Sequence, residues 1–255
     1  MIDEALRPHL VEFLLRHGDD RLVLGHRLAE WCGHGPALEE DIALANCALD
    51  FTGQANLMLG LAGSVEGKGR DQDALAYFRD EREFRNVQLV ELPRGDFGVT
   101  MVRQLLFDAY DVLFLEALQR SAYEDLAGIA AKAYKEARYH LRHSAEWVVM
   151  LGDGTGESHE RAQRALDELW RYGPELFDMD EGDRALASAG IVPDLAPLEP
   201  RWRERVEEVF ARATLAVPTG GFRAKGGRRG VHTEHLGHLL AEMQIVARSH
   251  PGASW

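Results

Sequence analysis

The chain has 255 residues, with 42 acidic side chains against 29 basic ones and a formal net charge of −13. This length suits one large domain, and the acidic balance argues against a general nucleic-acid-binding role. The longest apolar runs fall far short of the roughly 20 residues that a membrane-spanning helix requires. The N-terminus is acidic where a secretory signal would be basic and then apolar. We therefore expect a soluble protein in the cytoplasm.

Apolar residues recur at three- and four-residue spacing along nearly every long segment, which predicts an all-α fold. Breaks rich in glycine and proline separate these segments. Helices are expected, in chain order, over residues 3–16, 20–32, 37–65, 72–91, 97–120, 123–151, 157–177, 200–215 and 231–249. We predict one domain over residues 1–255, with a core bundle at about 37–151 and flanking helices at 3–32 and 157–249.

Each of the four predicted bundle helices places one acid on its apolar face: Asp50, Glu81, Asp108 and Glu136. A buried carboxylate is costly unless it is paired, protonated or bound to a metal. Ferritin-like di-iron proteins use such acids, because their site takes a lone acid from each of two helices and a Glu-x-x-His from each of the other two. The four acids therefore predict a ferritin-like four-helix bundle with additional flanking helices.

The histidines of that motif are missing. Phe84 stands three residues after Glu81, and Tyr139 stands three residues after Glu136. Phenylalanine cannot bind a metal, and a phenol is a poor substitute for imidazole. We therefore interpret these six positions as a vestigial di-iron site without metal. Basic side chains would hold the acids instead, and the candidates are Arg82, Arg85, Lys132 and Arg138.

Five segments carry a resemblance to a known family. They are residues 24–34 (LGHRLAEWCGH), 41–55 (DIALANCALDFTGQA), 79–84 (RDEREF), 135–142 (KEARYHLR) and 230–244 (GVHTEHLGHLLAEMQ). They resemble the C subunits of phenylacetyl-CoA epoxidases, the PaaC family, over most of the chain beyond the first dozen or so residues.

The resemblance implies a subunit of a multicomponent enzyme. Its expected partners are the catalytic di-iron subunit PaaA, which also holds the CoA substrate, the small subunit PaaB and an NADPH-dependent reductase. The complex would epoxidise the aromatic ring of phenylacetyl-CoA with O2 during phenylacetate degradation. This chain would be a non-catalytic structural subunit with no catalytic residue and no cofactor of its own. An active di-iron oxygenase with displaced ligands is the alternative.

A dense basic patch occupies a glycine-rich loop. Its cations are Arg223, Lys225, Arg228 and Arg229. Together with backbone donors, such a loop could bind an anion such as a CoA phosphate, or it could contact another subunit. A CoA-thioester binding module is therefore a further alternative for the chain.

A second polar cluster begins the last predicted helix. It contains His232, Glu234, His235, His238 and Glu242, of which His235 and His238 have the spacing of metal ligands on a helix. We interpret this cluster as the polar start of a helix, with contact to another subunit as its more plausible function.

Overall fold

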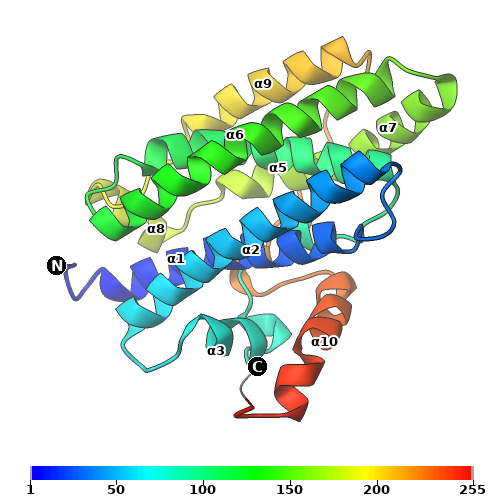
Figure 1. The fold of residues 1–255 in the computed structure, drawn as a ribbon. Helices are drawn as coiled ribbons and strands as arrows, with labels where there is room; N and C mark the ends of the chain where they lie inside the picture. Colours follow the sequence, from blue (N-terminus) through cyan, green and yellow to red (C-terminus); the bar gives the residue numbers. More distant parts are fainter. Residues whose placement is uncertain (1, 254–255) are drawn as a thin grey trace. The chain divides into compact units, whose positions relative to one another are not determined.

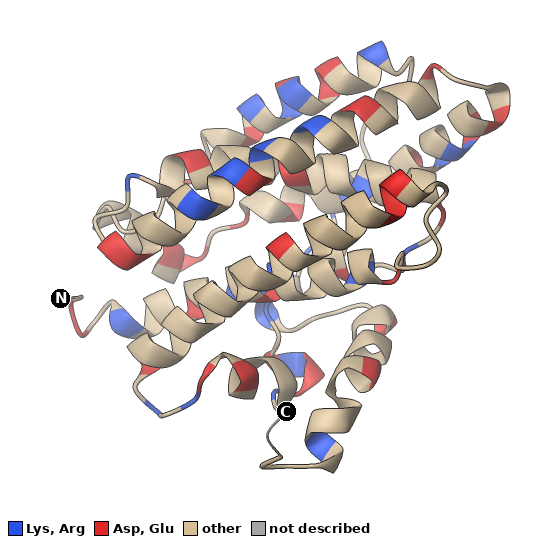
Figure 2. Ribbon diagram, viewed as in Figure 1, with Lys and Arg blue, Asp and Glu red and all other residues tan. Residues whose placement is uncertain are grey.

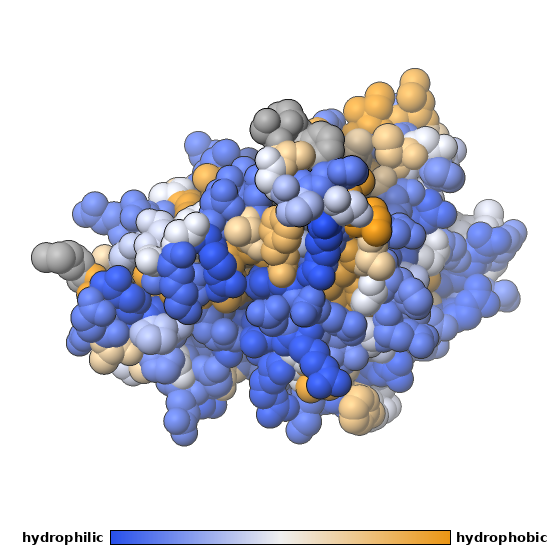
Figure 3. Space-filling view, turned by 90° about the horizontal axis from the view of Figure 1, so that it is seen from below, coloured by the Kyte–Doolittle hydropathy of each residue, from blue (hydrophilic) through white to orange (hydrophobic). Residues whose placement is uncertain are grey.

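The computed structural model describes residues 2–253 and contains helices but no strand within that range (Figure 1). It comprises two compact units, which are described separately. Unit 1 contains the residues up to 93 together with those from 225 onward, and unit 2 contains residues 94–224. Across 2–253, no helix is both long enough and apolar enough to span a membrane. On the face shown in Figure 3, hydrophilic side chains surround separate hydrophobic ones.

Unit 1 begins with a hairpin of two long helices, α1 (Arg7–Ala29) and α2 (Leu38–Glu66). The helices are antiparallel, because Gly18 of α1 lies against Leu59 and Gly25 lies against Ala48. A Cβ atom added to Gly18 would lie 2.7 Å from the Leu59 side chain. The prediction of two helices at 3–16 and 20–32 is therefore wrong. Gly18 allows close helix packing rather than ending a helix.

The rest of unit 1 consists of short elements and one longer helix: α3 (Gln72–Tyr77), the 3-10 turn η1 (Glu81–Glu83), α4 (Gln88–Glu91), the 3-10 turn η3 (Gly227–Arg229) and α10 (Glu234–Ser249). The continuous helix predicted at 72–91 does not form. The backbone N–H groups of Arg85 and Val87 donate to the carboxylates of Asp19 and Asp20, each over 2.8 Å. Because these N–H groups are used in this way, they cannot form helical bonds.

Unit 2 is built on α5 and contains α5 (Phe97–Leu118), α6 (Glu124–Gly152), α7 (Gly156–Leu169), the 3-10 segment η2 (Trp170–Phe177), α8 (Glu181–Ser188) and α9 (Leu198–Arg212). Helix α5 is apolar on nearly all sides and is buried along almost its whole length. It contacts α6, α7 and α9. Helix α6 is amphipathic and buries one stripe, which consists of Leu126, Ala130, Ala133, Ala137, His140, Ser144 and Val148.

The all-α, ferritin-like fold class is confirmed. Each unit supplies one pair of long antiparallel helices, α1 with α2 and α5 with α6. The predicted bundle membership needs a correction, because the long partner of α2 in unit 1 is α1 and not residues 72–91. Helix α8 was not predicted, although Asp180 and Asp183 form a capping box at its start. The single-domain assignment stays a prediction.

Candidate functional site

One of the four predicted inward acids is fully buried. Asp108 on α5 is 1% exposed, and the Ser144 hydroxyl on α6 donates to its Oδ2 over 2.8 Å. The Gln104 amide lies 3.5 Å from the other carboxylate oxygen. The stripe of α6 thus presents a hydroxyl and the His140 imidazole toward this carboxylate.

Burial raises the pKa of Asp108 to about 7, although His140 and the Ser144 hydrogen bond act in the opposite direction. Near neutral pH, a substantial fraction of this side chain is therefore a neutral carboxylic acid. The Ser144 hydroxyl also lies 3.0 Å from the His140 carbonyl oxygen. When Asp108 carries a proton, it can donate to Ser144, which can then donate to that carbonyl.

The other predicted acids occupy different environments. Asp50 on α2 and Glu136 on α6 are half-buried, and both have interaction partners. Glu81 is exposed and lies in the 3-10 turn η1, outside the long helices. The prediction that Glu81 lies on the buried face of a bundle helix is therefore wrong. The turn places it beside Gly237 of α10 instead.

The two positions that replace the histidines also differ from each other. Phe84 is fully buried, and the Arg79 guanidinium lies 4.3 Å from its ring centre. Tyr139 is 42% exposed and stacks on the His143 ring. Neither side chain offers a nitrogen donor.

The donor set does not fit a di-iron centre. Phe84 is an apolar core residue, and Glu81 and Tyr139 are exposed. The one histidine on the buried stripe of α6 is His140, and the residue three positions before it, where the motif has a glutamate, is Ala137. Within residues 2–253, no three His, Cys, Asp or Glu side chains are grouped so that they could hold a metal ion.

Sequence reasoning missed a network of buried charges centred on α1. Asp19 is fully buried and accepts two hydrogen bonds from the Arg79 guanidinium, one of them over 3.0 Å. The Arg85 N–H completes its coordination. Arg79 also donates to the Glu83 carbonyl oxygen and stacks on Phe84, so one arginine fixes the whole turn around η1.

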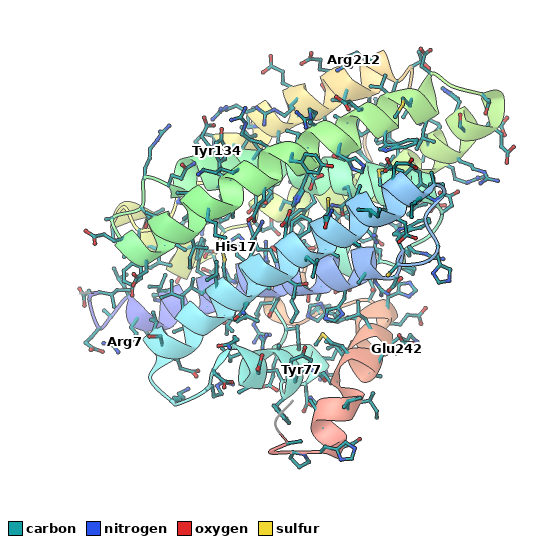
Figure 4. The ribbon with its side chains drawn as sticks, viewed as in Figure 1. Arg7, His17, Tyr77, Tyr134, Arg212 and Glu242 are labelled. Atoms are coloured by element: carbon teal, nitrogen blue, oxygen red, sulfur yellow. The ribbon has the colours of Figure 1, made fainter. Side chains whose placement is uncertain are left out.

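Asp20 forms the neighbouring pair with Arg228. Their carboxylate and guanidinium groups lie 2.8 Å apart, and Arg228 also donates to the carbonyl oxygens of Arg16 and Arg85. The side chains of Asp20 and Arg228 are 0% and 8% exposed. Figure 4 labels His17 on α1 and Tyr77 on α3. Asp19 and Asp20 come shortly after His17 in the sequence, and Arg79 comes shortly after Tyr77.

The basic loop is therefore not one patch. Arg228, a predicted candidate for CoA phosphate, is in the interior of unit 1 and is already paired. Arg223 belongs to unit 2 and lies 3.4 Å from Glu199. Lys225 and Arg229 are exposed. Of the four cations predicted to form a basic patch, only Lys225 and Arg229 are both exposed and without an ion pair among residues 2–253.

The histidine cluster is also divided. The His232 ring bonds the Glu91 carboxylate over 2.7 Å and the Phe84 carbonyl oxygen over 3.0 Å, and its side chain is 1% exposed. Burial lowers the pKa of His232, but the contributions that raise it, led by the hydrogen bond to Glu91 and the Glu91 charge, together outweigh burial, so the net shift of the pKa is upward. Glu234, His238 and Glu242 are exposed on α10. His232 thus has a structural role in unit 1.

The helix pair of unit 1 carries an arginine in its interior. Arg21 of α1 is fully buried, and its Nε donates to the Gln54 amide oxygen of α2 over 3.0 Å. Its guanidinium also donates to the His17 carbonyl oxygen. A cation therefore occupies the α1–α2 contact, where a metal half-site would require acids and an imidazole.

A family model described as "phenylacetic acid catabolic protein" matches residues 1–255. The chain is also 49% identical over 246 residues to the C subunit of the 1,2-phenylacetyl-CoA epoxidase of Escherichia coli (strain K12). That alignment covers 96% of this chain and 99% of the relative.

Proposed function

The chain belongs to the phenylacetic acid catabolic protein family, and on this premise we propose that it is a non-catalytic structural subunit of a phenylacetyl-CoA epoxidase. Its role would be to support a homologous di-iron catalytic subunit, PaaA. A small subunit, PaaB, and an NADPH-dependent reductase would complete the enzyme. Involvement in phenylacetate catabolism follows from the family itself.

The observation that carries the proposal is the chemistry of the vestigial positions. A di-iron bundle needs two imidazole ligands at fixed offsets from two glutamates. Here the corresponding side chains are Phe84, which packs in the core, and Tyr139, which faces solvent. The buried polar groups serve packing instead, since Asp19 and Asp20 hold the segment after α3 in place.

Helix α2 supports a role in helix-on-helix contact with another subunit. It exposes four large apolar side chains, Leu38, Ile42, Leu49 and Leu57, by 72%, 53%, 70% and 39%. Between residues 42 and 65 its sequence contains Asp50 as the single charged residue. Interface cores are depleted in charge in this way, whereas the solvated faces of soluble helices are rich in charge.

Co-purification followed by metal analysis tests the proposal. The chain is co-expressed with the other epoxidase subunits, with the affinity tag on the catalytic subunit, and the iron content of each separated chain is measured. We expect this chain to elute with the tagged subunit and to hold no stoichiometric iron. About two irons per chain, with an oxo-bridge absorption band, would instead identify an active di-iron oxygenase.

Calorimetry separates the remaining alternative. The purified chain is titrated with phenylacetyl-CoA, and the catalytic subunit serves as the positive control. We expect no heat of binding to this chain alone. Saturable binding would support a CoA-thioester binding module and would contradict a purely structural role.

A further inference from the structure

The outward face of α6 carries four cations in succession: Lys132, Lys135, Arg138 and Arg142. All four are exposed, and the steps between them are three, three and four residues. They therefore lie along one side of the helix over about 15 Å. Figure 2 shows basic positions following one another along α6. We call these four residues the cationic stripe.

The stripe has no acidic counterpart within the described chain. None of its four cations forms an ion pair among residues 2–253. Some exposed arginines of other helices in unit 2 are paired locally, as Arg161 is with Glu157 on α7 and Arg203 with Glu207 on α9. Glu136 stands four residues after Lys132 and Glu146 four residues after Arg142, but neither acid forms an ion pair with the four cations.

This arrangement is unfavourable for the isolated helix. Like charges three or four residues apart repel each other on a helix surface, and the stripe contains three such neighbouring pairs. The sequence has acids in excess, with a net charge of −13, yet Glu136 is the single acid within residues 132–142. A surface that is unfavourable when alone becomes favourable when opposite charges cover it.

Two of the cations lie over aromatic rings of the same helix. The Arg138 guanidinium lies 6.0 Å from the ring centre of Tyr134, and the Arg142 guanidinium lies 5.5 Å from that of Tyr139. Tyr134 is labelled on α6 in Figure 4. A guanidinium already held over a ring loses less side-chain freedom when it binds an anion. The stripe is thus partly preorganised.

We infer that the cationic stripe binds an acidic helix face on the catalytic subunit of the epoxidase. Carboxylates repeated at three- and four-residue spacing on a partner helix would match the cations along its length. A long polyanion such as nucleic acid would instead meet the repulsion of the whole acidic chain. A membrane surface would require apolar anchors, and Tyr139 is the one exposed large apolar side chain among residues 132–142. The inference rests on the proposed function, since it names the surface through which the two subunits meet.

Charge reversal with a matched control tests this inference. The test variant is Lys135→Glu/Arg138→Glu, and the control is Arg184→Glu/Arg212→Glu. The control cations are exposed, belong to the same unit and form no ion pair among the described residues, and the change in net charge is identical. A second test variant, Lys135→Arg/Arg138→Lys, keeps the charge. The dissociation constant with the purified catalytic subunit is measured at low and high salt.

We expect the reversal to weaken binding by about 10-fold or more near 50 mM salt and by much less near 500 mM, because salt screens charge contacts. The control and the charge-conserving variant should bind as the wild type does. Equal binding by the reversal and the control would overturn the inference while leaving the proposed function intact. Failure of the wild-type chain to bind would contradict the proposed function itself. Tighter binding of the wild type to anionic vesicles or duplex DNA, lost in the reversal, would also overturn the inference.

Discussion

The pair formed by Asp19 and Arg79 provides a quantitative test of the buried network. Replacing Asp19 with Asn keeps the size of the side chain and removes its charge. The Arg79 guanidinium would then stay buried, at 3% exposure, opposite a neutral amide. Removing one member of a buried ion pair costs about 3–5 kcal/mol, which corresponds to a melting temperature lower by roughly 6–20 °C for a chain of this size.

Urea unfolding followed by circular dichroism measures this cost. The control is Glu81→Gln, which removes a charge from the same segment at an exposed position and should change stability by no more than about 0.5 kcal/mol. Asp19→Asn/Arg79→Met should recover part of the loss, because it leaves no unpaired charge. If Asp19→Asn cost no more than Glu81→Gln, the ion pair would not hold this segment in place.

Three further predictions concern protonation and packing. The pKa of Asp108 is raised from 3.8 to about 7 in the folded chain. Its contribution to stability is therefore fully present below pH 3.8 and is lost as the pH rises to 7, by at most about 1.4 kcal/mol per pH unit. Asp108→Asn should flatten that part of the stability profile, and an unchanged slope would contradict the raised pKa. The pKa of His232 is raised above 6.5, so its contribution to folding stability is present below pH 6.5 and is lost as the pH rises through the folded pKa. His232→Gln should remove this loss of stability in the same unfolding series. If the stability profiles of the variant and the wild type were parallel, the pair of His232 with Glu91 would not titrate in that range. Gly18→Ala should destabilise the chain by about 1–3 kcal/mol, because the added Cβ atom would meet Leu59. Gly53→Ala has open space around the added atom and should stabilise the chain slightly. Similar shifts of the melting temperature in both variants would refute the close α1–α2 contact.

Helical periodicity predicted most of the fold, since the ends of α2, α5 and α6 fall within a few residues of the expected ones. It failed around α1 for a physical reason. The sequence Gly18-Asp19-Asp20 has the composition of a loop, yet the glycine allows close packing and both acids are buried. Local composition cannot reveal partners that lie about 60 and 208 residues away, as Arg79 and Arg228 do.

The same partners explain why residues 72–91 do not form one helix. The local sequence Arg79–Phe84 supports helical periodicity, and the sequence pattern alone could not indicate that distant carboxylates take the N–H groups of Arg85 and Val87. A capping box between Asp80 and Glu83 was the one local signal of a break. Of the four acids expected on apolar faces, Asp108 was placed correctly in the core because α5 is apolar on nearly all sides and is buried along most of its length.

Two buried acids of unit 1, Asp19 and Asp20, are paired with arginines. In a di-iron bundle, carboxylates from neighbouring helices are neutralised by two irons. In unit 1, the carboxylates of Asp19 and Asp20 are neutralised by Arg79 and Arg228, whose segments also belong to the stretches that carry the family resemblance or adjoin them. These arginines each reach backbone carbonyl oxygens as well, so they join α1 to two segments that are distant in sequence. The positions where the di-iron motif would have histidines differ as well, since the residue at 84 lies against Arg79 and the residue at 139 faces solvent.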